Sequence, residues 1–236
     1  MNVHGLSISL NSTQPVALFE FYRDRLHVKA NPDMGEMALM AGSTPLLLDG
    51  HSELAGPAQE PARTLLNFLV DDVGQEQQRL EAAGVRFLGK PSADVISFST
   101  YVDPDGNYGQ IFSMPGVPGD GSLAVGRHSG DPERLRLFMR DVVGLSDDLA
   151  APGSPFIVGG TAIYISSHSE VHGPSTEPAR LLISFFVDDL AAEQRRIEGH
   201  GVQFIRTAGR EDWGGLISTF PDPDGNYLQL IGFRPE

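Results

Sequence analysis

Two glutamines at matching places in the chain are the first candidates for chemistry. Gln110 and Gln229 each follow an Asp-Pro-Asp-Gly-Asn-Tyr segment, at residues 103–108 and again at 222–227. An amide side chain both donates and accepts hydrogen bonds, so a glutamine in a cavity can orient a bound organic molecule. Its oxygen can also bind a divalent metal, although carboxylate and imidazole are stronger and commoner ligands. Alternatively, these amides bond to each other, to the backbone or to water.

Trp213 is the only tryptophan in the chain and lies in the segment 211–215, just before an expected strand. An aromatic side chain on a Gly-flanked loop at the rim of a cavity suits stacking on a flat ligand. The alternative is that Trp213 only covers the edge of a sheet.

Two histidines recur in the same context, since His51 and His168 are each followed by Ser and Glu. Imidazole beside carboxylate can form an acid–base pair or a weak metal site. The polar surroundings favour a plain surface loop instead. The chain offers no partner by which to interpret His27, His128 or His172.

A charged pair also recurs, Glu60 with Arg63 and Glu177 with Arg180, at the start of an expected strand. Exposed ion pairs of this kind contribute little to stability. We therefore expect both pairs to lie on the surface with little energetic weight.

These candidates recur because the chain repeats itself. Residues 56–63 (GPAQEPAR) match 173–180 (GPSTEPAR) at a shift of 117 (173 − 56), and the Asp-Pro-Asp-Gly-Asn-Tyr segments match at a shift of 119 (222 − 103). A repeat with this many landmarks in order indicates two copies of one domain. A segment rich in Gly and Pro marks the join. The predicted organisation is a first domain at 1–115, a linker at 116–122 and a second domain at 123–236.

Each copy alternates between strand and helix patterns. Leu6, Ile8 and Leu10 alternate with serines, which predicts a strand with one buried face. Proline near the first helical position predicts helices from Pro15 and Pro132, and an N-capping Asp72 predicts another over 73–83. Further strands are expected at 65–70 and at about 36–42, 44–49, 85–88, 97–102 and 108–113, with counterparts in the second copy. The predicted fold class is α+β, with helices on the outer face of a curved mixed sheet.

The Val-Asp-Asp motifs at 70–72 and 187–189, together with the segments leading from 103 to Gln110 and from 222 to Gln229, carry a family resemblance. The chain resembles the vicinal oxygen chelate superfamily, which includes glyoxalase I, bleomycin-resistance proteins, fosfomycin-resistance enzymes and extradiol dioxygenases. The resemblance implies two βαβββ modules in each copy, with sheets that cup around a cavity. It leaves open whether a cup forms within one copy or across both.

Enzymes of this superfamily usually hold a divalent metal in the cup with His, Gln or Glu from four strands. Carried over to this sequence, the ligand positions fall on Gln110 and Gln229, on Leu65 and Leu182, near Gly5 and Ser122 with His4 adjacent, and near Asp49. Leucine cannot coordinate a metal, so no complete ligand set remains. The resemblance therefore predicts metal-free cups, with a divalent metal held by Gln110 or Gln229, His4 and Asp49 as the alternative.

The strand before each Val-Asp-Asp motif supplies the other predicted site residues. Asn67 and Ser184 are expected to face the cavity beside the two glutamines. Leu65, Leu182 and Phe186 occupy the same inward face and would form an apolar wall, or simply fill a core.

Composition narrows the possible partners. The formal charge of −14 makes nucleic acid and anionic membranes unsuitable partners, because binding to phosphate arrays relies on Lys and Arg. The absence of cysteine excludes disulfides, a thiol nucleophile and thiolate metal sites. With no apolar run of about 20 residues and no signal-like start, we expect a cytoplasmic protein, monomeric or homodimeric.

The favoured hypothesis is a metal-independent protein that sequesters a small hydrophobic or aromatic compound, a drug or natural product, as in the bleomycin-resistance branch that the sequence resembles. This implies a role in antibiotic resistance rather than in catalysis. The alternative is an enzyme of the same fold, metal-dependent or cofactorless, acting as a lyase, isomerase or extradiol dioxygenase.

Overall fold

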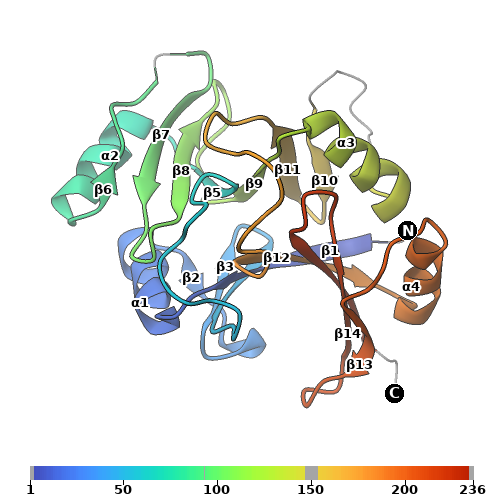
Figure 1. Cartoon of the computed structure of the whole chain (residues 1–236). Helices are drawn as coiled ribbons and strands as arrows, with labels where there is room; N and C mark the ends of the chain where they lie inside the picture. The colour runs from blue at the N-terminus through green and yellow to red at the C-terminus, as the bar shows by residue number, and fades with distance from the viewer. Residues whose placement is uncertain (1–2, 93, 147–153, 234–236) are drawn as a thin grey trace.

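The computed structural model describes residues 3–92, 94–146 and 154–233, which form four modules of related architecture (Figure 1). The first contains β1 (Val3–Asn11), α1 (Pro15–Glu20), the π-helical segment η1 (Phe21–Arg25), β2 (Lys29–Ala30), the 3-10 turn η2 (Pro32–Met34), β3 (Ala38–Ala41) and β4 (Thr44–Asp49). The second contains β5 (Thr64–Leu69), α2 (Val73–Ala82), β6 (Arg86–Phe87), β7 (Ser97–Val102) and β8 (Tyr108–Ser113).

The second half repeats this order. The third module contains β9 (Leu123–His128), α3 (Pro132–Leu137), the π-helical segment η3 (Phe138–Val143), β10 (Phe156–Val158) and β11 (Thr161–Ser166). The fourth contains β12 (Leu181–Val187), α4 (Leu190–Glu198), β13 (Arg206–Arg210), β14 (Leu216–Pro221) and β15 (Tyr227–Gly232). The α+β class and the duplicated architecture are confirmed.

Local sequence explains where the helices begin. The side chain of Asp72 accepts a hydrogen bond from the backbone N–H of Gln75, and Asp131 does the same for Arg134, so each caps its helix. Pro15 and Pro132 occupy first-turn positions where a missing donor costs nothing. The predicted helix starts are confirmed.

The two sheets are shared between the halves of the chain. The eight-stranded sheet has the order β13-β14-β15-β12-β1-β4-β3-β2 and so joins the fourth module to the first. The seven-stranded sheet, β10-β11-β9-β5-β8-β7-β6, joins the third to the second. Antiparallel pairs β1–β12 and β5–β9 form the joints. The two halves are therefore interlocked, which answers the question that the sequence left open.

One face of each sheet packs on the helices. On β1, Leu6, Ile8 and Leu10 are at most 3% exposed and lie in a core with helical residues such as Leu18 and Leu135. Since side chains alternate along a strand, the residues between them face away from the helices. We call these two helix-free faces the eight-stranded cup and the seven-stranded cup.

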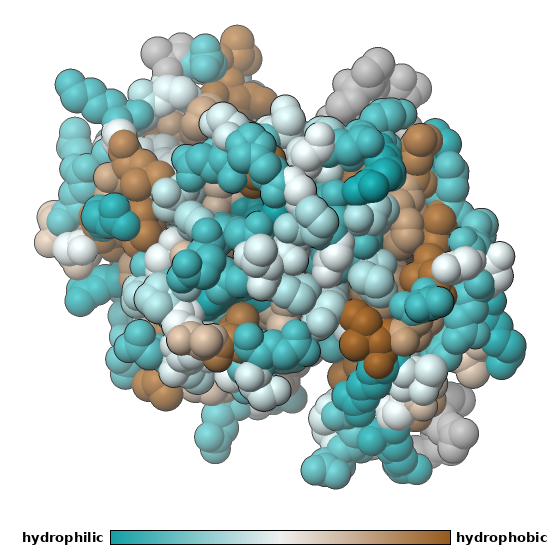
Figure 2. Space-filling view, viewed as in Figure 1, coloured by the Kyte–Doolittle hydropathy of each residue, from teal (hydrophilic) through white to brown (hydrophobic). Residues whose placement is uncertain are grey.

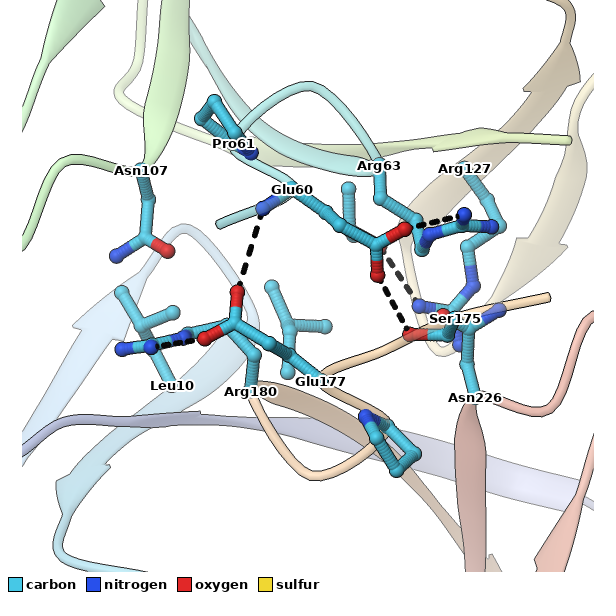
Figure 3. A pocket seen from close by; sticks show the side chains of 13 residues that line it. Leu10, Glu60, Pro61, Arg63, Asn107, Arg127, Ser175, Glu177, Arg180 and Asn226 are labelled. Carbon is cyan, nitrogen blue, oxygen red and sulfur yellow. Dashed lines mark hydrogen bonds and ion pairs between the residues drawn. The ribbon is translucent and has the colours of Figure 1, made fainter. Parts of the chain in front are cut away.

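The repeated charge pairs lie between the halves, so the expectation of surface ion pairs is wrong. Arg63 and Arg180 are 4% and 8% exposed. Figure 3 shows the carboxylate of Glu60 between Arg63 and Ser175, and that of Glu177 reaching from Arg180 to the backbone of Glu60. The loops that join the modules cross here, and each glutamate accepts hydrogen bonds from the other copy. Figure 2 shows predominantly hydrophilic residues over the middle of this view.

Candidate functional site

A row of polar side chains crosses the floor of the eight-stranded cup. Ser7, Ser184, Gln229 and Thr219 are neighbours in register on four adjacent strands. The Ser184 hydroxyl donates to Gln229 Oε1 at 2.9 Å, and Gln229 Nε2 donates to Thr219 Oγ1 at 3.3 Å. Both ends of the Gln229 amide are therefore bonded within the sheet itself.

The equivalent row of the seven-stranded cup differs in the atom that it leaves without a partner in the described part of the chain. In the eight-stranded row that atom is the buried Ser7 hydroxyl. Ala124, Asn67, Gln110 and Thr100 stand in register where the other cup has Ser7, Ser184, Gln229 and Thr219. Gln110 Nε2 donates to Thr100 Oγ1 at 3.2 Å, as in the other copy. Asn67 replaces the hydroxyl donor, and its buried Oδ1 has no partner among the described residues. A buried amide oxygen without a partner is costly, so this cup floor is set to receive a donor.

A cavity of about 230 Å³ lies over this floor. Its lining combines aromatic and apolar side chains with the two amides of Asn67 and Gln110. The aromatic and apolar members come from β7, β8, β11 and their flanks: Ile96, Phe98, Phe112, Met114 and Tyr164. An apolar pocket with a few convergent polar groups is the usual form of a site for a small organic molecule.

His128 at the end of β9 also lines this cavity. Its Nδ1 lies 2.5 Å from the Ala62 carbonyl oxygen, and its ring stacks on His168 with centroids 5.0 Å apart. Burial lowers the pKa of His128. The sequence analysis found no partner for His128 and favoured a loop role for His168. The alternation of Gly126 and His128 with core residues on one strand could have revealed a cavity-facing histidine.

Trp213 belongs to the other cup. Its ring, 53% exposed, lies 5.7 Å from that of Phe233, which in turn lies 5.9 Å from Phe186 on the helix-free face of β12. The predicted site residues thus divide by sheet. Leu65, Asn67 and Gln110 belong to the seven-stranded sheet, whereas Leu182, Ser184, Phe186 and Gln229 belong to the eight-stranded one.

The turns before β8 and β15 hold the glutamines in place. Asp103 Oδ1 accepts the backbone N–H groups of Asp105 and Asn107, both at 2.9 Å, and the Tyr22 hydroxyl donates to Oδ2 at 3.2 Å. Burial raises the pKa of Asp103 to about 6. Asp222 closes the second turn in the same way. Burial raises the pKa of Asp222, although the nearby cation of Arg127 lowers it.

The side chains of the two cups do not fit the divalent metal that the fold suggests. Asn67, Gln110, Ser184 and Gln229 offer only neutral oxygens, which are poor ligands without carboxylate or imidazole partners. In the seven-stranded cup the cavity lining adds one imidazole, that of His128, and no carboxylate from the residues that the structure describes. Of the other predicted ligands, His4 Nε2 lies 2.8 Å from Asp188 Oδ1 at the surface. Asp49 Oδ1 accepts a hydrogen bond from the backbone N–H of Gly50. Within residues 3–92, 94–146 and 154–233, no three His, Asp or Glu side chains converge on one point.

Comparison with known families agrees with this architecture. The model of the Glyoxalase/Bleomycin resistance protein/Dioxygenase superfamily matches residues 125–230, and that of a glyoxalase-like domain matches residues 7–112. The chain belongs to this superfamily. It carries two such domains in tandem, so the family resemblance of the sequence is confirmed.

Solved structures share the whole fold. A glyoxalase I mutant from Zea mays is similar with a TM-score of 0.68 at 15% identity, covering 98% of this chain and 93% of its own. A putative dioxygenase from Bacillus subtilis subsp. subtilis str. 168 has a TM-score of 0.58 at 14% identity, covering 100% and 86%. At this identity the likeness shows the fold alone. No curated protein sequence matches the chain. No helix of the described residues is long and apolar enough to cross a membrane.

Proposed function

We propose that the seven-stranded cup binds a small aromatic molecule without a metal ion. The observation that carries this proposal is the unpartnered Asn67 amide oxygen, beside Gln110, in the floor of an aromatic-walled cavity. A ligand that places a donor on this floor relieves the cost of the buried acceptor, while its ring packs against the walls.

The volume of the cavity and the net charge of the protein limit the class of ligand. A cavity of about 230 Å³ is slightly below the range of about 300–1,000 Å³ common for drug-sized molecules, which favours one or two rings. The net charge of −14 favours neutral or cationic compounds over anionic ones. Sequestration of such a compound, a natural product or drug, is the role that this site suits, with the cofactor-free cup acting as a container rather than a catalyst.

Matched glutamine variants test the proposal. Calorimetric titration with a panel of one- and two-ring aromatic compounds is expected to find saturable binding. Gln110→Leu is expected to weaken it by about 1–3 kcal/mol, the cost of an unpaired polar group. Gln229→Leu, the same change in the other cup, leaves the affinity unchanged. Weakening only by Gln229→Leu would move the ligand to the eight-stranded cup, and an unresponsive panel would contradict the proposal.

The fluorescence of Trp213 gives an independent measure of which cup the ligand occupies. This side chain lies beside the eight-stranded cup, so a ligand in the seven-stranded cup leaves its emission unquenched. Metal analysis of protein purified without chelator completes the test. We expect less than one equivalent of divalent metal and no change of affinity or melting temperature in EDTA, since a bound metal would stabilise the fold by mass action. One equivalent of metal, lost in EDTA together with stability, would support an enzyme instead.

A further inference from the structure

The side chain of His128 has one ring nitrogen committed to the protein. Its Nδ1 lies 2.5 Å from the carbonyl oxygen of Ala62. A carbonyl oxygen can only accept, so Nδ1 carries the hydrogen. In a neutral imidazole, Nε2 is then an acceptor with a free lone pair.

The space over Gly126 lies close to this nitrogen. A Cβ atom built on Gly126 would be 3.8 Å from His128 Nε2 and 3.2 Å from Asn67 Nδ2. The two side chains therefore approach the same space over the glycine, on the face that lines the cavity. In the other copy, Ser9 and Asn11 occupy the positions of Gly126 and His128, so this arrangement belongs to the seven-stranded cup.

The surroundings keep His128 neutral. Burial lowers the pKa of His128 and outweighs the hydrogen bond to Ala62, which raises it, while the stacked His168 also lowers it. His168 Nδ1 itself accepts the backbone N–H of Glu170 at 3.2 Å. The nearby guanidinium groups are turned elsewhere, since that of Arg63 binds Glu60 and that of Arg127 binds Thr64. Protonating His128 would place a charge in a largely buried position with no carboxylate described beside it.

We infer that His128 Nε2 is the specificity element of the seven-stranded cup and accepts a hydrogen bond from an aromatic hydroxyl or ring N–H of the ligand. This rests on the proposed binding of an aromatic molecule in that cup. The ligand class is then a phenol or an N–H heteroaromatic compound, with Asn67 and Gln110 bonding its remaining polar groups.

The first test needs no ligand. Nitrogen-15 NMR of the histidine rings in the full chain at pH 7 is expected to show one ring protonated at Nδ1 and bare at Nε2. That signal disappears in His128→Asn, which introduces the residue found at the equivalent position 11, and in His128→Phe, which keeps a flat ring. A protonated Nε2 in His128 would overturn the inference whatever the protein binds.

The second test uses a matched pair of probes, 2-naphthol and 2-methoxynaphthalene, in which a methyl group replaces the hydroxyl hydrogen and so removes the donor. Calorimetry of the wild-type chain is expected to show at least tenfold tighter binding of 2-naphthol. His128→Phe removes most of this difference, and Gln229→Leu preserves it. Equal affinities in the wild type would overturn the role of His128 while leaving aromatic binding intact. Failure of both probes to bind would contradict the proposed function and the inference with it.

Discussion

The two cups are built from the same repeated module, yet small differences on one face separate them. Ser184 in the eight-stranded cup donates to its glutamine, whereas Asn67 takes that place in the seven-stranded cup and leaves an acceptor open. Gly126 replaces Ser9, and His128 replaces Asn11. Among the residues that the structure describes, the eight-stranded floor bonds its glutamine at both ends and leaves the Ser7 hydroxyl without a partner, whereas the seven-stranded floor leaves an amide oxygen without one below a cavity.

A second difference lies under the turns. The carboxylate of Asp103 accepts a hydrogen bond from the Tyr22 hydroxyl. In the other copy, Asp222 Oδ2 lies 3.5 Å from Arg127 Nη2. The residues equivalent to Tyr22 and Arg127 in the opposite copies are Met139 and Leu10. The same buried carboxylate is therefore stabilised by a neutral hydroxyl in one copy and by a cation in the other.

Separating the halves gives the largest expected effect. Fragments 1–115 and 123–236 each lack the partner strands of both sheets, because β1 pairs with β12 and β5 with β9. Alone, each exposes two sheet edges and is expected to aggregate or form a swapped dimer. Mixing the two should restore one soluble 1:1 complex, observed by light scattering. A monomeric fragment that unfolds cooperatively would refute the shared sheets.

Arg127→Leu is expected to give the second-largest effect. It leaves Asp222 buried without its cation, which is expected to reduce the free energy of unfolding by about 3–5 kcal/mol in urea titrations. Adding Met139→Tyr should recover part of this loss by supplying the hydroxyl that Asp103 has. Arg23→Leu is the control, because both side chains of the Arg23–Asp24 pair are exposed, at 41% and 51%, and its loss should change the free energy of unfolding only slightly. A loss no larger than the control's would contradict the assignment.

Tyr22→Phe tests the neutral hydroxyl beside Asp103 through the pH dependence of stability. The folded pKa of Asp103 is raised to about 6, so ionisation of this group destabilises the fold progressively as pH rises from about 4 through 6. The Tyr22 hydroxyl favours the ionised form, and its removal raises the pKa further. We expect a loss of about 1–2 kcal/mol at pH 8 and a smaller one at pH 4.5. An equal loss at both pH values would show that only packing has changed.

The smallest effect concerns a backbone difference. His27 adopts φ 57°, where the equivalent residue of the second copy is Gly144 at φ 84°. Left-handed backbone costs a residue with a Cβ about 1 kcal/mol. His27→Gly is therefore expected to raise the free energy of unfolding by about 0.5–1 kcal/mol, and Gly144→Ala to lower it by a similar amount. Thermal unfolding of both variants measures these changes in stability. A destabilising His27→Gly would contradict the strain argument.

Sequence reasoning recovers the elements well, because alternation, N-caps and turn motifs are local. Strands β4, β7 and β8 end where the pattern predicts. The pairing of modules across the halves depends on long-range contacts that no local pattern records. For the same reason, Glu60 and Arg63 look exposed in the sequence but lie at the crossing of two loops. His128 was missed because its partners Ala62 and His168 are distant in the chain.

The central claim is that the seven-stranded cup is the binding site. Amide chemical-shift mapping of the full chain with 2-naphthol tests it most directly, because both cups are observed in one experiment. The account predicts saturable shifts at Asn67, Gln110 and Gly126, with Ser7, Ser184 and Gln229 unmoved. Saturable shifts confined to Ser7, Ser184 and Gln229, or none in either cup, would contradict it.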